Sequence, residues 1–246
     1  AKLATVLTGE SYEILFVDDG STDGSGEVLD ELCRQNPRVR IIRFARNFGK
    51  STALHAGFRE SRGEIVITMD ADLQDDPVEI PRLLAALAKG YDLVSGWKVH
   101  RKDPLSKTVP SKFFNFATAR LTGIRLHDFN CGFKAYRRKL VENLHIYGEQ
   151  HRFIPAIACW KGFRVTEIDV RHQPRAFGRS KFGARRFFSG FIDLLTILFL
   201  TRFVHKPLHL FGSVGLLCFG AGLVINLYLT GLRFLGERIG TRPLLQ

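Results

Sequence analysis

The chain has 246 residues, of which 45% are hydrophobic and 24% charged, and its formal net charge is +12. This composition excludes a disordered chain and a collagen-like chain, and the length suits one large domain or one domain with an appendage. The four cysteines, at positions 33, 131, 159 and 218, form no CxxC pair and no zinc spacing. That pattern excludes a disulfide scaffold and a zinc ribbon, and it favours a reducing compartment.

The charge is divided unevenly along the chain. Residues 1–95 carry 11 Lys and Arg against 16 Asp and Glu, whereas residues 96–246 carry 25 against 8. A basic surplus of this kind is typical of a chain that binds nucleic acid, an anionic membrane or a phosphorylated substrate, and also of a solvated basic face. The acidic and basic parts therefore have different tasks.

Short apolar runs alternate with helical patterns through the first 95 residues. The pattern predicts strands over 12–17, 39–44, 64–69 and 91–95, and helices over 25–35, 51–62 and 78–89. This alternation predicts an α/β fold with a parallel sheet, in which ligands bind at the carboxyl ends of the strands. Residues 1–10 resemble the end of a helix, so we expect a strand upstream of them and an unpaired edge or gap in the sheet where it belongs.

Two groups of acidic residues follow predicted strands. Asp70, Asp72 and Gln74 come directly after the strand at 64–69, and alternate residues leaving a strand can point the same way. Three such oxygen donors suit Mg²⁺ or Mn²⁺ shared with substrate phosphates. Asp18 and Asp19 follow the first strand and can accept hydrogen bonds from a base or ribose. Solvated acids in a turn, or a cluster at a helix N-terminus, are the structural alternatives.

Two nucleotide-binding motifs are incomplete in this sequence. The tripeptide Gly-Lys-Ser at 49–51 resembles a P-loop, but Phe44 occupies the position of the required first glycine. Gly20, Gly24 and Gly26 resemble a dinucleotide fingerprint, but Leu29 stands where a further small residue is expected. The neighbouring aspartates would also repel a pyrophosphate that carries no metal. We therefore reject both interpretations.

The C-terminal part carries a membrane signature. Residues 207–232 contain no Asp, Glu, Lys or Arg, and as a helix they would measure ~39 Å, more than the ~30 Å hydrocarbon core. They predict a transmembrane helix, with a buried core helix as the alternative. Residues 187–201 are apolar apart from Asp193 and are flanked by arginines, which is typical of a helix in the membrane interface. Eight Lys and Arg against one acid over 171–206 place this side in the cytoplasm.

A set of motifs in fixed order carries a family resemblance over about residues 10–240. They are YEILFVDDGSTDGS, RFARNFGKSTALHAGF, MDADLQDDP, DFNCGFKAYRR, HRFIPAI and RHQPRAFGRSKFG. The chain resembles the family-two glycosyltransferases of the dolichol-phosphate-mannose-synthase type, and among them the bacterial polyprenyl-phosphate glycosyltransferases, which append two transmembrane helices. The resemblance implies a GT-A fold and an enzyme that transfers a hexose-type sugar with inversion. The donor would be a nucleotide-sugar, with a UDP-sugar favoured over GDP-mannose, and the acceptor a polyprenyl phosphate such as undecaprenyl or dolichyl phosphate.

The resemblance also assigns roles to individual residues. It implies nucleotide binding by Asp18, Asp19, Lys50 and Asp70, and a metal site for Mg²⁺ or Mn²⁺ at Asp70, Asp72 and Gln74. It implies catalytic roles for Asp72 and Asp128. The residues implied to bind the lipid phosphate are Arg101, Lys112, Arg175, Ser180 and Lys181. The sequence departs from the family at Lys112, which stands in place of an arginine and cannot form its bidentate fork. The family's opening strand, with its nucleotide loop, and the second transmembrane helix are also not found in this sequence.

The expected organisation follows from these assignments. We expect a GT-A domain over 1–183, interfacial amphipathic helices over 184–206, a transmembrane helix over 207–232 and the start of a loop toward a second span over 233–246. The protein would lie at the bacterial inner membrane with its catalytic domain on the cytoplasmic face. Its partners would be the nucleotide-sugar, the polyprenyl phosphate and membrane lipid, with no nucleic acid and with homo-oligomerisation left open. The alternative is a non-catalytic membrane scaffold or flippase partner that retains the fold.

Overall fold

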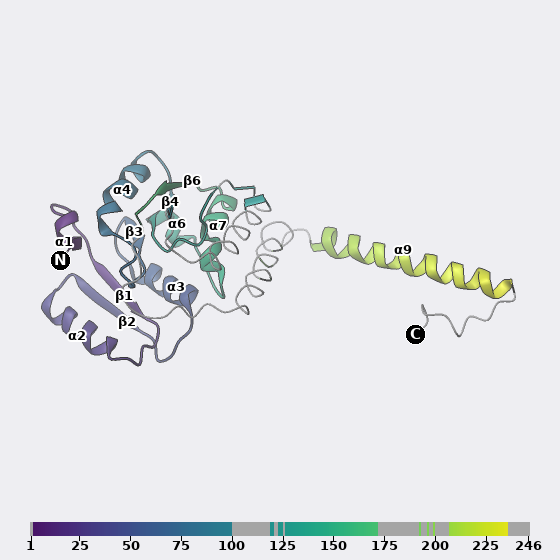
Figure 1. Cartoon of the computed structure of the whole chain (residues 1–246), viewed down its shortest axis with the longest axis horizontal. Helices are drawn as coiled ribbons and strands as arrows, with labels where there is room; N and C mark the ends of the chain where they lie inside the picture. Colours follow the sequence, from purple (N-terminus) through teal and green to yellow (C-terminus); the bar gives the residue numbers. More distant parts are fainter. Residues whose placement is uncertain are drawn as a thin grey trace. The chain divides into compact units, whose positions relative to one another are not determined.

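The computed structural model describes residues 2–99, 119–120, 123–124, 126–171, 192, 196, 199 and 207–235. The chain divides into two compact units, Ala1–Ile197 and Leu198–Gln246. The elements of the first unit (Figure 1) are α1 (Lys2–Val6), β1 (Ile14–Asp18), α2 (Ser25–Gln35), β2 (Val39–Arg43), α3 (Lys50–Glu60), β3 (Ile65–Thr68), the 3₁₀ turn η1 (Pro77–Glu79), α4 (Ile80–Ala88), β4 (Leu93–Trp97), β5 (Lys134–Arg137), α6 (Arg138–Glu142), the 3₁₀ turn η2 (Gln150–Phe153), α7 (Ile154–Trp160) and β6 (Val165–Asp169). The second unit contains α9 (Pro207–Phe234).

The strands in the described part of the chain form two sheets rather than one. β1 and β2 pair in parallel, and the second sheet has the order β3-β5-β4-β6. β4 and β6 are parallel, but β5 runs antiparallel to both of its neighbours. The predicted parallel sheet is therefore a mixed one, because β5 enters between β3 and β4 in the opposite direction. Among the described residues, β1 and β3 each pair with a strand on one edge only. That a further strand fills the gap beside them stays a prediction.

The α/β alternation predicted for the first 95 residues is confirmed, with element ends shifted by a few residues. The strand predicted at 91–95 is shifted furthest, to β4 at Leu93–Trp97, and the helix predicted over 78–89 begins as the separate turn η1 before α4. Asp76 caps this turn, since its carboxylate accepts a hydrogen bond from the backbone N–H of Val78 at 3.2 Å. Pro77 follows at the first helical position, where its fixed φ and missing N–H cause no loss.

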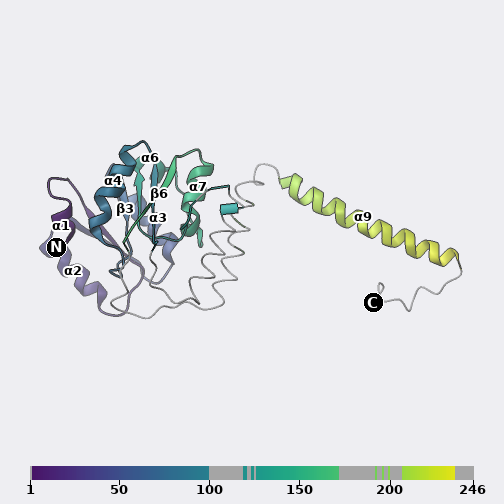
Figure 2. The same cartoon turned by 45° about the horizontal axis from the view of Figure 1, so that its top comes forward.

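The main core lies between α4 and the four-stranded sheet (Figure 2). Ile80, Leu83 and Leu87 on α4 are buried, and they pack with Val94 of β4 and Ala135 of β5. Full burial of each such side chain contributes about 1.5–3 kcal/mol. Three apolar side chains near the N-terminus, Leu3, Val6 and Leu7, pack against the same cluster. This core fixes the larger sheet, and with it the loops at the ends of β3 and β4.

The helix α9 of the second unit has the length and composition of a membrane span. It has 28 residues, a mean hydropathy of 2.0 over its most apolar window and no buried residues. At 1.5 Å per residue it measures ~42 Å, which exceeds the ~30 Å hydrocarbon core. α9 therefore contains the whole uncharged stretch at 207–232. The interfacial helices expected over 184–206 lie outside the described residues except for positions 192, 196 and 199.

Candidate active site

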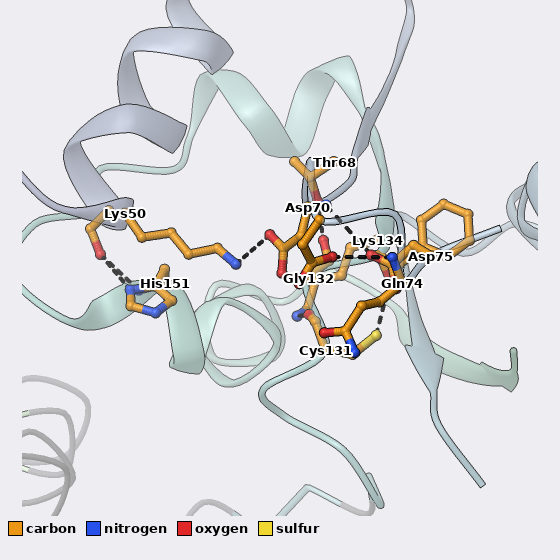
Figure 3. Close-up of polar contacts among 12 residues, drawn as sticks. Lys50, Thr68, Asp70, Gln74, Asp75, Cys131, Gly132, Lys134 and His151 are labelled. Carbon is orange, nitrogen blue, oxygen red and sulfur yellow. Dashed lines mark hydrogen bonds and ion pairs between the residues drawn. The ribbon is translucent and has the colours of Figure 1, made fainter. Parts of the chain in front are cut away.

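The carboxylate of Asp70 lies at the centre of the candidate site (Figure 3). Asp70 follows β3, and its Oδ1 is 2.6 Å from Nζ of Lys50, the first residue of α3. Burial by itself would raise the pKa of Asp70, but Lys50, Lys98 and Lys134 together lower it below its ordinary value. Asp70 is therefore ionised at neutral pH and lies beside a cation. The structure thus brings together two of the residues predicted to bind nucleotide.

Gly132 lies against the other side of this carboxylate. A Cβ atom added at Gly132 would be 2.6 Å from Oδ2 of Asp70 and 2.8 Å from its Cγ, closer than any real contact. The carbonyl of Gly132 accepts a hydrogen bond from Oγ1 of Thr68 at 2.7 Å, which joins the loop before β5 to the end of β3. Only a residue without a side chain allows this approach. The glycine of the CGF motif is therefore explained by the position of Asp70.

A buried ion pair supports the turn that contains Asp70. Oδ1 of Asp75 is 3.0 Å from Nζ of Lys98, and both side chains are buried or nearly so. The other oxygen of Asp75 accepts a hydrogen bond from the backbone N–H of Asp70 at 3.4 Å. Removing one member of such a pair leaves an uncompensated buried charge. Asp75 and Lys98 therefore hold the DADLQD turn in place, a role that no motif in the sequence indicates.

Asp72 and Gln74 lie on a tight part of the same turn. Leu73 between them has φ of 61°, the only positive value at a non-glycine residue in the described part of the chain. The backbone N–H of Gln74 donates to Oδ1 of Asp72 at 3.2 Å. Left-handed backbone at a leucine is costly and is found mostly where the surroundings require it, often in functional loops.

The predicted metal site consists of Asp70, Asp72 and Gln74. Among the residues that the structure describes, His, Cys, Asp and Glu side chains form no group of three or more that could hold a metal ion. The predicted donor set contains two carboxylates and one amide, and Mg²⁺ usually takes one or two carboxylates together with substrate phosphates. A cation already lies beside Asp70, in the form of the Lys50 ammonium. By their chemistry these oxygen donors suit a hard divalent ion shared with a diphosphate; that they bind one together stays a prediction.

Asp18 and Asp19 hold loops near the start of α3. Asp18 is buried and accepts a hydrogen bond from the backbone N–H of Ser21 at 2.9 Å, and hydrogen bonds from Ser21 lower its pKa. Asp19 accepts hydrogen bonds from the backbone N–H groups of Phe48 and Gly49 at 2.7 and 2.9 Å. Asp19 therefore holds the residues directly before Lys50, at the start of α3, whereas Asp18 holds the turn after β1. Their predicted contacts with a nucleotide stay predictions.

Asp128 lies in the loop that leads into β5. Its side chain is buried, and Oδ1 accepts a hydrogen bond from the backbone N–H of Asn130 at 3.0 Å. The buried ammonium of Lys134 donates to the carbonyl oxygens of Phe129, at 3.3 Å, and Cys131. Burial lowers the pKa of Lys134, and it raises the pKa of the Cys131 thiol to about 11. The loop that carries Asp128 and Gly132 is therefore tied to the core from its C-terminal side.

His151 adds a group that the sequence analysis quoted only within the HRFIPAI motif. Its Nδ1 is 3.0 Å from Oγ of the buried Ser51, and its backbone N–H donates to the same oxygen at 3.0 Å. Figure 3 shows His151 joined by this contact to the start of α3, where Lys50 extends toward Asp70. His151 and Lys50 line one small pocket together with Asn130, Gly132 and Lys134. No local pattern predicts a contact between residues 100 positions apart.

The predicted lipid-phosphate residues lie outside the described part of the chain. They are Arg101, Lys112, Arg175, Ser180 and Lys181. Their assignment stays a prediction.

Comparison with known proteins identifies the family of the chain. The family model of Glycosyl transferase family 2 matches residues 2–144. Dodecaprenyl-phosphate galacturonate synthase of Rhizobium johnstonii is 40% identical over 248 residues, covering 98% of this chain and 73% of the relative. Undecaprenyl-phosphate 4-deoxy-4-formamido-L-arabinose transferase of Pseudomonas aeruginosa is 41% identical over 231 residues, covering 94% and 67%. These relatives are bacterial polyprenyl-phosphate glycosyltransferases by name, as the sequence motifs implied.

Solved structures show the fold. Glucosyl-3-phosphoglycerate synthase of Mycobacterium tuberculosis, in complex with Mn²⁺, UDP and glucosyl-3-phosphoglycerate, matches with a TM-score of 0.58 and 18% identity, over 80% of this chain and 71% of that one. A mannosyltransferase of Pyrobaculum calidifontis, in complex with GDP-Man and Mn²⁺, matches with a TM-score of 0.52 and 20% identity, over 87% and 71%. The predicted GT-A fold is confirmed, and the chain belongs to glycosyl transferase family 2.

Proposed function

We propose that this protein transfers a sugar, with inversion, from a nucleotide-sugar to a polyprenyl phosphate at a membrane. The observation that carries the proposal is the ionised Asp70, held between Lys50 and Gly132 on the turn that also bears Asp72 and Gln74. Anionic and cationic groups at a strand end suit a diphosphate leaving group and its counter-ion. The relatives named for polyprenyl-phosphate transfer, at 40–41% identity, support the acceptor class.

A divalent ion fits the donor set of this turn. Asp70, Asp72 and Gln74 would hold it, and Lys50 would lie beside it, next to the phosphates. When bound, such an ion stabilises the negative charge that develops on the leaving diphosphate. The two solved structures described above contain Mn²⁺, which supports a divalent ion of the Mn²⁺ or Mg²⁺ kind.

The acceptor chemistry removes the need for a strong base. The second pKa of a phosphate monoester is about 6, so a lipid phosphate already carries an anionic oxygen at neutral pH. Positioning the two substrates in line then supplies much of the rate acceleration. Asp128, buried in the loop before β5, would orient the sugar or take a proton, but transfer does not require it to act as a base.

The membrane location rests on α9 and on the basic segment before it. α9 is long and apolar enough to cross a bilayer, and residues 171–206 carry eight Lys and Arg against one acid. This charge bias favours a catalytic unit on the cytoplasmic side of the membrane. Nucleotide-sugars are available on that side. With α9 as an anchor, the first unit would work beside the headgroups, where the phosphate of a polyprenyl lipid lies.

A donor panel tests the proposal. The purified protein would be incubated with UDP-sugars, including UDP-uronic acids, and with GDP-mannose, each with a short polyprenyl phosphate and Mn²⁺ or Mg²⁺. We expect lipid-linked sugar from one class of donor, loss of product with EDTA and recovery with metal. A protein that forms no product and hydrolyses no donor under any of these conditions would instead fit the non-catalytic scaffold.

Lys181→Ala and Arg175→Ala should impair use of the lipid acceptor more than binding of the nucleotide. Both residues lie in the basic segment next to the predicted interfacial helix, and each would contribute a cation to the lipid phosphate. We expect the KM for the acceptor to rise about tenfold, which corresponds to ~1.4 kcal/mol, with the nucleotide Kd unchanged in calorimetry. A weaker nucleotide Kd with an unchanged acceptor KM would show that the roles are assigned wrongly.

A further inference from the structure

A second anchor holds the loop of Asp128 from its N-terminal side. The carboxylate of Glu167, on β6, accepts hydrogen bonds from the backbone N–H of His127 through both of its oxygens, at 3.1 and 2.9 Å. Oε1 of Glu167 also contacts Nδ1 of the His127 ring. The next residue in the chain is Asp128. A single carboxylate from a neighbouring strand therefore fixes the backbone directly before a predicted catalytic residue.

The ring of His127 is held from its other side as well. It stacks on the indole of Trp97, with 4.1 Å between ring centroids and 13° between the planes. Trp97 is the last residue of β4, and β4 pairs in parallel with β6, with Ser95 opposite Glu167. Glu167, His127 and Trp97 form a group that we call the β6 clamp. Two strands of the core sheet thereby support one residue of the loop.

The burial pattern separates this contact from an ordinary surface pair. The side chain of Glu167 is only 12% exposed, whereas that of His127 is 65% exposed. A largely buried carboxylate that accepts a backbone N–H forms a charge-assisted hydrogen bond, which is stronger than a neutral one. Lys134 ties the same loop beyond Asp128, through the carbonyls of Phe129 and Cys131. Asp128 therefore lies between two anchors, Glu167 and Lys134. Of the two, only Glu167 contacts an exposed side chain, that of His127.

We propose that Glu167 is a positioning residue for sugar transfer, which acts through His127 to fix the backbone and carboxylate of Asp128. The proposal rests on the function proposed above. The proposed role requires no contact between Glu167 and either substrate. Without it, Asp128 would sample several orientations, and misplacement of a reacting group by about 1 Å can lower a rate about a hundredfold.

Substitutions at Glu167 test the catalytic consequence. In Glu167→Ala we expect kcat for transfer to fall about 10- to 100-fold, with the KM for the nucleotide-sugar changed less than about twofold. Glu167→Gln keeps an oxygen acceptor for the His127 N–H and should stay within about threefold of the parent kcat. Asp169→Ala is the matched control, because Asp169 lies two residues further along β6 and pairs with Arg82 rather than with the loop. It should retain the parent kcat.

Trp97 provides a readout that does not depend on activity. The chain has two tryptophans, so in a Trp160→Phe background the emission reports Trp97 alone. Loss of the stacked imidazole exposes one face of the indole to water, so Glu167→Ala should shift the emission maximum to longer wavelength, whereas Glu167→Gln and Asp169→Ala should not.

Unchanged emission in Glu167→Ala would overturn the clamp itself. A shifted emission with parental kcat would overturn its positioning role. A parent protein without any transfer activity would refute the proposed function, while the emission would still test the clamp.

Discussion

Asp72→Asn should lower the rate of sugar transfer at least about a hundredfold, since loss of a metal-ligand charge at the leaving diphosphate removes several kcal/mol of transition-state stabilisation. The substitution keeps the shape of the side chain and an oxygen that can accept the 3.2 Å hydrogen bond from the Gln74 N–H. The fold should therefore be unaffected. Initial rates with a donor found by the panel, measured over a range of Mn²⁺ concentrations, would test this expectation.

Asp76→Asn is the matched control for that experiment. It makes the same chemical change four residues further along the same acidic motif, where the side chain caps the turn before α4. Asn is about as good a cap as Asp, so both the melting temperature and the transfer rate should stay close to those of the parent. Parental turnover in Asp72→Asn, or an equal loss in Asp76→Asn, would show that Asp72 has no special role at the metal.

The part of the fold that the sequence predicted well is the part governed by local patterns. The predicted helix at 25–35 coincides with α2, and the predicted strand at 39–44 differs from β2 by one residue. The turn-forming residues Asn36 and Pro37 separate the two elements, and neighbouring residues are enough to define each of them. The predicted transmembrane stretch at 207–232 lies inside α9 for the same reason.

β5 shows what local patterns do not predict. Its four residues, Lys134–Arg137, begin and end with a basic residue, so they carry no strand periodicity. They become a central strand by pairing with Ile65–Thr68 on one side and with Leu93–Ser95 on the other. Lysine is almost never fully buried, and Lys134 is buried here because two loop carbonyls accept its hydrogen bonds. Such an exception follows from contacts in three dimensions.

The candidate site likewise has one part that the local sequence predicts and another that it does not. The DADLQ pattern after a predicted strand was enough to identify Asp70 as a candidate ligand, because the residues before and after it supplied the argument. Its partners were not predictable, since Lys50 lies 20 residues before it and Gly132 lies 62 residues after it. The sequence contains a signal for Gly132 only in its CGF motif, and the reason for that glycine became evident from the packing.

Gly132→Ala should be as damaging to activity as loss of a ligand, although it removes no functional group. The new Cβ would lie 2.6 Å from Oδ2 and 2.8 Å from Oδ1 of Asp70. The carboxylate must then rotate or shift, and its 2.6 Å contact with Lys50 would be lost or distorted. Because a displacement of about 1 Å can lower a rate about a hundredfold, we expect a loss of that size in kcat/KM for the nucleotide-sugar, together with a weaker nucleotide Kd.

Gly26→Ala separates this effect from the general cost of replacing a glycine. Its Cβ would lie 3.3 Å from Nη2 of Arg43, the far end of a flexible side chain, and Gly26 lies in the first turn of α2. Alanine is favoured over glycine in helices by about 1 kcal/mol, so this variant should be at least as stable as the parent and fully active. Full activity in Gly132→Ala as well would mean that transfer does not depend on where the Asp70 carboxylate lies.

Combining Gly132→Ala with Lys50→Met then gives the decisive comparison. If the alanine acts by separating Asp70 from Lys50, adding it to a Lys50→Met background should cost little further activity, because the contact is already absent there.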